Sequence, residues 1–322
     1  MKKTIIEVPN YYTNMKKILL IFLAIAAVSC CNTEKVQRKA KHVIFIGVDG
    51  VSTTLFKNPA LLERMPNVKM MMEQGSYTIE KRSVMPSSSA INWASIFNGL
   101  PTEQHGYNNW NSSKPEIPAV IDNGRGMPPT IFTILREQRP EAESGCVYNW
   151  DGIGPLIDTT VINYHLYDPG YHNPENYLLE NYTRERAVKY ILEKKPDFFT
   201  FYIGDVDEVG HSSGWESEAY YDCLADTDRM VGIIIQATKD AGIFDDTIFL
   251  FSSDHGGLNK GHGQFLMEHL ETPFVLYGKN IRKGYVLDEP MMQYDVTATL
   301  AYALGLQIPK EWRGRPMKSM FK

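Results

Sequence analysis

Residues 247–262, Thr-Ile-Phe-Leu-Phe-Ser-Ser-Asp-His-Gly-Gly-Leu-Asn-Lys-Gly-His, decide the fold that this sequence predicts. The apolar run Ile248–Phe251 is short and rich in β-branched and aromatic residues, which is typical of a strand covered on both faces. Gly256–Gly257 then allow a sharp turn. Adjacent residues of a regular strand point to opposite faces, so Asp254 and His255 can share a site only where the chain leaves the strand. We therefore expect a functional site at this strand end, where ligands gather in α/β sheets.

Two other segments repeat this order of apolar strand, acid and glycine. Residues 42–50 contain Asp49, and residues 198–211 contain Asp207 and His211. A single Asp-Gly or Asp-His pair is most often a turn or a solvated loop. Three such strand ends favour one shared site, because the carboxyl ends of parallel strands meet and clustered acids repel unless a cation is bound. Carboxylates and imidazoles without thiolate suit Zn²⁺ or Mn²⁺, and the spacing of Asp207 and His211 would put both on one side of a helical turn.

The composition is that of an ordinary globular protein large enough to bury a sizeable core. The 322 residues are 43% hydrophobic and 22% charged, with a net charge of −5 and no basic block, so we expect no nucleic-acid duplex as a partner. Helical and strand patterns alternate without an internal repeat, which predicts an α/β fold, a three-layer α/β/α sandwich with a mostly parallel central sheet. The segments expected to be helical are 66–74, 130–138, 183–195, 216–241 and 295–304. Further strands are expected at 77–84, 145–148 and 273–278.

The first thirty residues are not expected to belong to this fold. Lys16–Lys17 precede an apolar run at 18–28, and small residues then lead to Cys30. This pattern resembles a bacterial lipoprotein signal peptide of residues 1–29, cleaved before a lipidated Cys30; the run is short for a transmembrane helix. Residues 30–40 would form a tether, and the protein would be exported and membrane-anchored, on the periplasmic or the cell-surface side. An uncleaved anchor and a simple secretory signal are the alternatives.

Residues 41–322 would then form one folded domain that contains Cys146 and Cys223. An exported compartment permits a disulfide between these two cysteines. Two separate buried thiols are as compatible with the sequence, because nothing in the spacing demands a disulfide.

A serine-rich helix start is the next candidate for the site. Residues 86–99 begin with a proline and Ser87, Ser88 and Ser89, and continue with apolar residues at helical spacing. Any of these serines would serve as an N-cap. A hydroxyl at the positive end of a helix could equally face a metal site, where a phosphoryl oxygen would be favoured.

Two long irregular stretches are expected around this helix. Residues 101–129 offer Asn109 and Trp110 as part of a substrate-binding wall, although exposed aromatic residues can also pack a loop down. Residues 150–174 are expected to be irregular as well, with solvated acidic and histidine side chains that include Asp151.

Several motifs in a fixed order resemble one known family. They are VDG at 48–50, PSSSAINWASIFNG at 86–99, LPTEQHG at 100–106, DVDEVGH at 205–211, SSDHGG at 252–257 and KGHG at 260–263. From about residue 43 to residue 316 the sequence resembles the alkaline phosphatase superfamily, and within it the type I phosphodiesterase/nucleotide pyrophosphatase group. Each motif alone is a weak signal, but their order and spacing together are a strong one. The resemblance implies an alkaline-phosphatase-like catalytic domain.

The resemblance also implies two divalent metal ions, zinc or another ion such as manganese, and a serine nucleophile. The ligands it assigns to the first ion are Asp207, His211 and His262. The ligands it assigns to the second are Asp49, Asp254, His255 and the nucleophile Ser89. His269 is a rival to His262 for the third histidine. The substrate-binding residues that it suggests are Asn92, which matches a family asparagine, and Asn109 for a non-bridging oxygen. Asn109 lies one place before the position of the family's asparagine, which Trp110 occupies, and Trp110 stays a candidate from the substrate-binding wall.

The implied activity is hydrolysis of small-molecule phosphodiester or nucleotide pyrophosphate bonds through a phosphoseryl intermediate, with retention at phosphorus. A sulfatase would need proline and arginine two and four places after the nucleophile, where Ser89 is followed by Ile91 and Trp93. An alkaline phosphatase-type phosphomonoesterase must neutralise one more charge, and no Arg or Lys lies between residues 82 and 114. The family's base-contacting aromatic residue is Ala90 here, so the substrate need not be a nucleotide. A catalytically silent surface lipoprotein that keeps the metal site to bind a ligand is the alternative from another class.

Overall fold

The computed structural model describes Met1, residues 36–169 and residues 182–322. The predicted signal peptide, the lipidation site Cys30 and the first part of the predicted tether lie outside the described residues. The fold is that of the unit Val36–Lys322.

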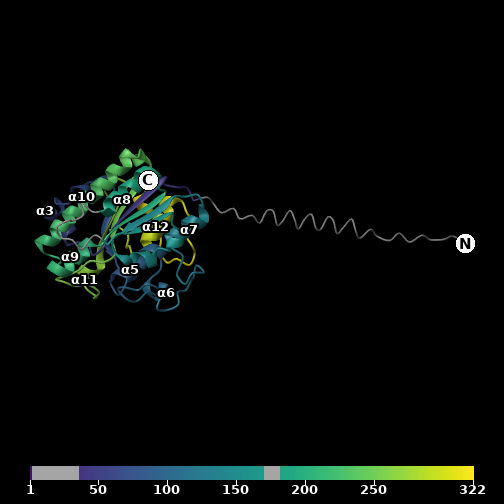
Figure 1. Cartoon of the computed structure of the whole chain (residues 1–322), viewed down its shortest axis with the longest axis horizontal. Helices are drawn as coiled ribbons and strands as arrows, with labels where there is room; N and C mark the ends of the chain where they lie inside the picture. Colours follow the sequence, from purple (N-terminus) through teal and green to yellow (C-terminus); the bar gives the residue numbers. More distant parts are fainter. Residues whose placement is uncertain (2–35, 170–181) are drawn as a thin grey trace. The chain divides into compact units, whose positions relative to one another are not determined.

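A central sheet of eight strands, in the order β4-β3-β5-β1-β6-β7-β2-β8, runs through the described residues (Figure 1). β7 is antiparallel to both of its neighbours, and the other neighbouring pairs are parallel. The central strands β1, β5 and β6 are buried along their whole length, as continuous apolar runs predict. The strands are β1 His42–Val48, β2 Ser76–Arg82, β3 Ser144–Tyr148, β4 Tyr164–Tyr167, β5 Phe198–Ile203, β6 Thr247–Ser253, β7 Glu271–Gly278 and β8 Tyr285–Val286.

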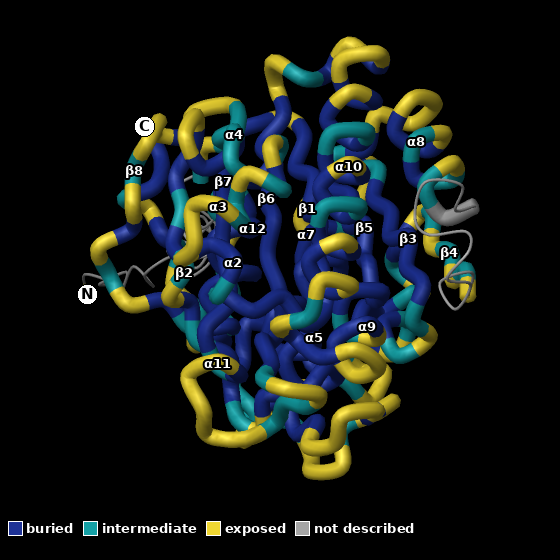
Figure 2. Tube along the Cα trace, turned by 90° about the vertical axis from the view of Figure 1, so that its left-hand side faces the viewer, coloured by how far each residue is buried: buried dark blue, intermediate teal, exposed yellow. Residues whose placement is uncertain are grey.

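Helices cover both faces of this sheet, so the predicted three-layer α/β/α sandwich with a mostly parallel sheet is confirmed. The helices that contribute to the core on one face are α5 Ser89–Asn98, α7 Ile131–Gln138 and α12 Asp295–Leu304. Those on the other face are α2 Thr54–Lys57, α4 Pro66–Gln74, α8 Tyr182–Lys194, α9 Asp205–Ser213 and α10 Glu218–Asp240. The described residues also contain the short helices α3 Pro59–Leu62, α6 Thr102–His105 and α11 Met267–Leu270. Figure 2 shows the buried strands in the middle and exposed chain on the outer turns.

The strand register brings the predicted site residues to one edge of the sheet. Val48 of β1 pairs with Ile203 of β5 and with Ser253 of β6. These three residues lie at the carboxyl ends of their strands, so the segments that follow them emerge side by side. α9 begins there with Asp205, directly after β5.

The structure differs from the expected elements mainly at the margins of the sheet. Residues 150–174 are not irregular throughout, because they contain the 3₁₀ turns Asp151–Leu156 and Thr159–Val161 and the strand β4. β4 has only half-buried and exposed residues, so it lacks the continuous apolar run by which the central strands were recognised. β8 is too short for a pattern to reveal it.

Cys146 and Cys223 are not joined by a disulfide. Both are buried, but they belong to the cores on opposite faces of the sheet. The alternative of two separate buried thiols is therefore confirmed, and the sheet between them explains why. Among the helices of the described residues, none has the length and apolar character needed to cross a membrane.

Candidate active site

The chain leaves the sheet directly after β6, and this departure lets Asp254 and His255 enter the same site. A glycine is required where the neighbouring strand ends. Gly50 has a positive φ of 71°, and a Cβ atom there would lie 2.8 Å from the Cα atom of Asp207. The close approach of the two segments therefore excludes every residue with a side chain at position 50.

Three ligand side chains, Asp49, Asp254 and His255, form what we call the buried cluster. His255 Nε2 lies 3.3 Å from a carboxylate oxygen of Asp49 and 3.3 Å from one of Asp254. Ser89, the first residue of α5, brings its hydroxyl oxygen to 3.2 Å from the same nitrogen and 3.4 Å from Asp49 Oδ1. The four residues that the resemblance assigned to one metal ion are thus in contact.

Asp207, His211 and His262 form what we call the open cluster. Asp207 and His211 are one turn apart on α9, with His211 Nε2 3.4 Å from Asp207 Oδ2. His262 comes from the loop after β6, and its Nε2 atom lies 3.1 Å from His211 Nε2 and 3.8 Å from Asp207 Oδ1. The exposed fractions of these three side chains are 18%, 43% and 10%.

All three histidines present the same ring nitrogen to the site. The Nδ1 atoms of His211, His255 and His262 lie 3.1, 2.9 and 2.9 Å from the carbonyl oxygens of Lys260, Gly256 and Ser87. A carbonyl oxygen only accepts hydrogen bonds, so each Nδ1 atom donates, and each Nε2 atom faces the carboxylates and is free to hold either a proton or a metal ion. This is the tautomer that a metal-ligating histidine needs.

The polar atoms left over in the site fit a pair of metal ions. Asp207 Oδ1 and Asp254 Oδ2 are buried and have no hydrogen-bond partner among the described residues. The facing Nε2 atoms of His211 and His262 also need a cation, either a proton or a metal ion, between their lone pairs. Carboxylate oxygens and imidazole nitrogens in groups of three suit Zn²⁺, with room for a nucleophile or substrate as a further ligand.

The pKa shifts of the three carboxylates also agree with a cation in this site. Burial raises the pKa of Asp254 well above its ordinary value, and the charges of Asp49 and Asp207 raise it further. Burial and the charge of Asp207 also raise the pKa of Asp49. For Asp207, burial acts in the same direction, but the hydrogen bond with His211 and the nearby imidazoles outweigh it and lower the pKa. That hydrogen bond raises the pKa of His211 to about 9, whereas burial lowers the pKa of His262 to about 3. A bound cation would favour the ionised form of all three carboxylates.

Two aromatic side chains hold Asp49 in place. Tyr202 on β5 donates its hydroxyl hydrogen to Asp49 Oδ2 over 2.6 Å, and Trp93 donates its indole N–H to the same oxygen over 2.9 Å. We did not predict either residue from the sequence. Trp93 lies four residues after Ser89 on the same helix, so its spacing was the signal that could have revealed it.

A buried polar group behind the buried cluster fixes the backbone where β6 ends. The Lys81 ammonium is wholly buried and donates to the Ser253 carbonyl over 2.8 Å and to the Gln293 amide oxygen. Gln293 and Ser83 donate to the Asp254 carbonyl over 2.7 and 2.6 Å. Burial lowers the pKa of Lys81 to about 7. These contacts hold the departure from the strand that Asp254 needs.

Three of the other predicted site residues lie away from the ligands. Asn92 is fully buried, and its amide bonds to the backbone of Val84 and of Ser88, so it braces the segment before α5 instead of facing substrate. Asn109 is exposed, and its amide donates to the neighbouring Asn108, so it does not line the cavity. His269 accepts from a backbone N–H through its Nδ1 atom and is outside both clusters.

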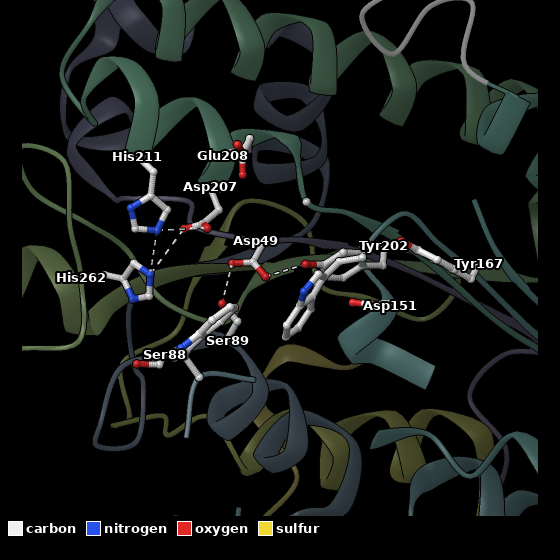
Figure 3. A pocket seen from close by; sticks show the side chains of 13 residues that line it. Asp49, Ser88, Ser89, Asp151, Tyr167, Tyr202, Asp207, Glu208, His211 and His262 are labelled. Atoms are coloured by element: carbon white, nitrogen blue, oxygen red, sulfur yellow. Dashed lines mark hydrogen bonds and ion pairs between the residues drawn. The ribbon is translucent and has the colours of Figure 1, made fainter. Parts of the chain in front are cut away.

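A cavity of ≈ 800 Å³ opens over the two clusters (Figure 3). Ser89, Asp49 and the open cluster lie on its floor, and Trp110 lines it as predicted. Asp151 lines it as well, although we expected this residue to be merely solvated. β3 pairs in parallel with β5, so the segment after β3 emerges at the same edge of the sheet as α9 and reaches the cavity.

Comparison with known proteins connects this geometry to a family. Residues 43–272 match the model of the family described as type I phosphodiesterase / nucleotide pyrophosphatase. Mouse ectonucleotide pyrophosphatase/phosphodiesterase family member 1 is 28% identical over 207 residues, which are 60% of this chain and 21% of the mouse protein. The chain thus spans about a fifth of the length of that relative.

Solved structures share the fold. Murine ectonucleotide pyrophosphatase/phosphodiesterase 5, in an inactive form in complex with AMP, superposes with a TM-score of 0.68 at 16% identity, over 89% of this chain and 100% of that chain. A mutant of the alkaline phosphatase PafA superposes with a TM-score of 0.69 at 13% identity, over the same fractions. At these identities the likeness establishes the fold alone.

Proposed function

Because the chain belongs to the type I phosphodiesterase/nucleotide pyrophosphatase family of the alkaline phosphatase superfamily, we propose that it is a metal-dependent hydrolase of phosphodiester or nucleotide pyrophosphate bonds in small molecules. The observation that carries the proposal is the position of the Ser89 hydroxyl. It lies at the start of α5, on the cavity floor, 3.2 Å from His255 Nε2 and 3.4 Å from Asp49 Oδ1. A hydroxyl held among metal-ligating groups is the arrangement that nucleophilic phosphoryl transfer requires.

The two clusters would each hold one divalent ion, zinc in the first instance and manganese as an alternative. The proposed ligands are Asp207, His211 and His262 in the open cluster, and Asp49, Asp254, His255 and Ser89 in the buried cluster. Two ions at such a site supply charge stabilisation for the attacking and the leaving oxygens of an in-line displacement. The carboxylates and imidazoles of this chain would orient that charge towards the Ser89 hydroxyl.

In the first step the Ser89 hydroxyl gives its proton to solvent and its oxygen forms a bond to phosphorus. The bond from phosphorus to the leaving oxygen breaks, and that oxygen takes up a proton from solvent if it leaves as an alcohol. The N-terminus of α5, directed at the reacting group, favours negative charge there. A water molecule then attacks the phosphoseryl group from the opposite side and releases Ser89. Two displacements give retention of configuration at phosphorus.

A diester is the preferred substrate in this proposal. Among the described residues, no lysine or arginine lines the cavity, whereas a phosphomonoester would bring a second negative charge that needs a cation to neutralise it. A phosphomonoesterase, a sulfatase and a silent binding protein are the alternatives that the test below separates.

The N-terminal segment completes the proposal. We propose that residues 1–29 are a signal peptide cleaved before Cys30, whose lipidation anchors the exported protein to a membrane through the tether 30–40. Labelling of growing cells with an alkyne-bearing fatty acid would test it. The label should appear on the protein and be absent from the Cys30→Ala variant.

The decisive experiment compares bis(p-nitrophenyl) phosphate, p-nitrophenyl phosphate and p-nitrophenyl sulfate as substrates of the purified protein with Zn²⁺ or Mn²⁺. We expect the diester to be hydrolysed fastest, and hydrolysis to be lost with a chelator and in Ser89→Ala. The Ser87→Ala variant is the matched control, because Ser87 is buried and bonds weakly to the Gln264 carbonyl over 3.4 Å. Faster monoester or sulfate turnover would replace the proposal by one of those activities, and bound metal without turnover would favour a binding protein.

A further inference from the structure

A group of cations lies at the end of the sheet opposite to the active site. We call it the basic face and define it as residues 38–41, 279–283 and 318–320, which contain seven lysines and arginines and no aspartate or glutamate. Lys279 follows β7, and its backbone N–H donates to the carbonyl of Thr247, the first residue of β6, over 2.9 Å. The basic face therefore lies at the amino edge of the parallel strands. In Figure 2 the C-terminus lies near the upper end of the molecule, whereas α9 and α11 lie towards the lower end.

Three segments that are far apart in the sequence build this face. The Arg282 guanidinium donates to the Ser319 carbonyl over 3.0 Å. Lys39 and Lys318 both place their ammonium groups over the ring of Tyr302, at 5.0 and 5.5 Å from its centroid. Arg282 and Lys318 are exposed. These contacts bring the cations of the three segments together on one surface that water reaches.

Most of these charges have no acidic partner. Two of the seven cations form ion pairs, Arg38 with Asp197 and Lys279 with Asp246. Among the described residues, no ion pair involves the other five, which are Lys39, Lys41, Arg282, Lys283 and Lys318. Glu289 accepts a hydrogen bond from the Ser319 hydroxyl at the margin of the face, but it is paired with Arg315. The basic face is therefore a region of net positive charge.

The rest of the folded unit has the opposite charge. Residues 1–35 contribute +3 to the −5 of the whole chain, so the unit Val36–Lys322 carries −8. The residues of this unit outside the basic face carry −15. An anionic surface repels most of such a molecule and attracts one face of it, so it also sets the orientation in which the molecule approaches.

The chain enters the fold at this same face. Val36 and Arg38 pack against Gly305 at the end of α12, where a Cβ atom would lie 2.8 Å from the Val36 carbonyl oxygen. The proposed lipidation site, Cys30, precedes Val36 by six residues, which span at most about 20 Å when extended. A lipid on Cys30 would therefore keep the basic face close to a bilayer.

We propose that the basic face docks on an anionic phospholipid bilayer, with the amino edge of the sheet towards the membrane. The cavity then opens at the opposite edge, and the seven residues of β1 separate the two edges by about 20 Å. Substrates reach the cavity from the aqueous phase, which favours water-soluble phosphodiesters over the phospholipids of the same membrane. The inference takes its setting from the proposed lipidation, but its binding test depends neither on lipidation nor on turnover.

Sedimentation with vesicles tests the docking. The unit Val36–Lys322 contains both hydrophobic cores, so it can be used without the anchor. It should bind vesicles made of equal parts phosphatidylcholine and phosphatidylglycerol in preference to vesicles of phosphatidylcholine alone, and this binding should weaken as salt concentration rises. Since the unit as a whole carries −8, net charge predicts the reverse preference. No binding to the anionic vesicles, or equal binding to both kinds, would overturn the inference.

Paired variants assign the binding to this face. Arg282→Gln combined with Lys318→Gln should lower the partition coefficient about 25-fold, because each cation near an anionic membrane contributes about fivefold. The matched control is Lys114→Gln combined with Lys189→Gln, which makes the same change in net charge at exposed positions outside the basic face. The control should retain the partition coefficient of the wild type. An equal loss in both double variants would show that the basic face is not the docking surface.

Two further measurements separate the outcomes. A unit that binds heparin but not the anionic vesicles would carry a site for a soluble polyanion, and the inference would fail. Hydrolysis of bis(p-nitrophenyl) phosphate by the zinc-loaded unit should have the same kcat/KM free and bound to vesicles, whereas a large fall on binding would show that the membrane covers the cavity and would overturn the orientation. If neither state hydrolyses the ester, the proposed diesterase function fails, and the vesicle binding of the paired variants decides this inference by itself.

Discussion

The buried cluster and the open cluster use the same kinds of side chain, yet they are built in different ways. In the buried cluster the exposed fractions of the His255, Asp49 and Asp254 side chains are 0%, 3% and 0%. Its members are held from behind by buried hydrogen bonds, such as those from Tyr202 to Asp49 and from Gln293 to the Asp254 carbonyl. In the open cluster, His211 is 43% exposed.

This difference indicates that the ligand positions are fixed more firmly in the buried cluster than in the open cluster. The buried cluster is part of the core, so its ligand positions are set by packing and by hydrogen bonds that cannot relax without cost. The open cluster rests on one turn of α9 and on a loop, and water can reach its ligands. We therefore expect substitutions in the buried cluster to cause a large loss of activity that added zinc or imidazole does not restore. Substitutions in the open cluster should cause a loss of activity that added zinc or imidazole partly restores.

The largest effect is expected from removing one histidine of each cluster. His255→Ala should lower kcat/KM on the order of 10³-fold, because it removes a ligand that also contacts Ser89. His211→Ala should be comparably impaired at low zinc, but millimolar zinc or imidazole should restore part of its activity, because the half-exposed position can be refilled. The measurements are kcat/KM against zinc and imidazole concentration, together with the zinc content per chain. Equal rescue of both variants would contradict the comparison.

A smaller effect is expected from the hydroxyl that holds Asp49. Tyr202→Phe keeps the ring and removes the 2.6 Å hydrogen bond to Asp49 Oδ2, so zinc affinity or activity should fall about 10- to 100-fold. The matched control is Tyr302→Phe, at a ring that packs on Phe321 away from the cavity. A Tyr202→Phe variant with the zinc affinity and kcat/KM of the control would show that Trp93 alone orients Asp49.

Both the fold and the ligand sets could be predicted because their signals are local. A continuous apolar run followed by Asp and Gly is typical of the end of a buried parallel strand. This pattern occurs three times, at the ends of β1, β5 and β6. The motif around Asp254 and His255 was one of those that together carried the resemblance, and the structure gathers the ligand residues of these motifs into clusters. Strand ends of one parallel sheet must meet, so the meeting of these residues follows from the fold class.

The residues that we did not predict depend on contacts between distant segments. Lys81 meets Gln293 across 212 positions of sequence, and a lysine in a strand is ordinarily read as solvent-facing. Asn92 was assigned to substrate from its place in a motif, but a motif does not state which way a helical side chain points. Asp151 reaches the cavity because β3 pairs in parallel with β5, a neighbour that the order of the sequence does not reveal.

The third prediction concerns the support behind the buried cluster. Burial lowers the pKa of Lys81 to about 7, whereas an unfolded lysine titrates near 10.4. Between these values the unfolded chain binds one more proton than the folded protein, so stability rises with pH across this window. Lys81→Met lacks this titration. The free energy of unfolding of the wild type, relative to that of the variant, should therefore rise by up to about 4 kcal/mol between pH 7 and pH 10.

Urea unfolding at several pH values measures this difference. The matched control is Lys279→Met, an exposed lysine paired with Asp246, for which the difference from the wild type should stay constant over the same range. A constant difference for Lys81→Met as well would mean that Lys81 keeps its ordinary pKa in the folded protein. The support for the Asp254 backbone would then have to come from Gln293 and Ser83.

The smallest effect is expected from His269, and it tests where the open cluster ends. His269 accepts a hydrogen bond from the Gln264 backbone N–H and lies outside the group formed by Asp207, His211 and His262. His269→Ala should therefore cost about 1 kcal/mol of stability, change kcat/KM by roughly threefold or less, and leave two zinc ions per chain. His262→Ala, the reference, should lose the metal of the open cluster and most of its activity. If His269→Ala lost a zinc ion instead, the loop between His262 and His269 would have to rearrange when metal binds. His269 would then be a ligand of the open cluster.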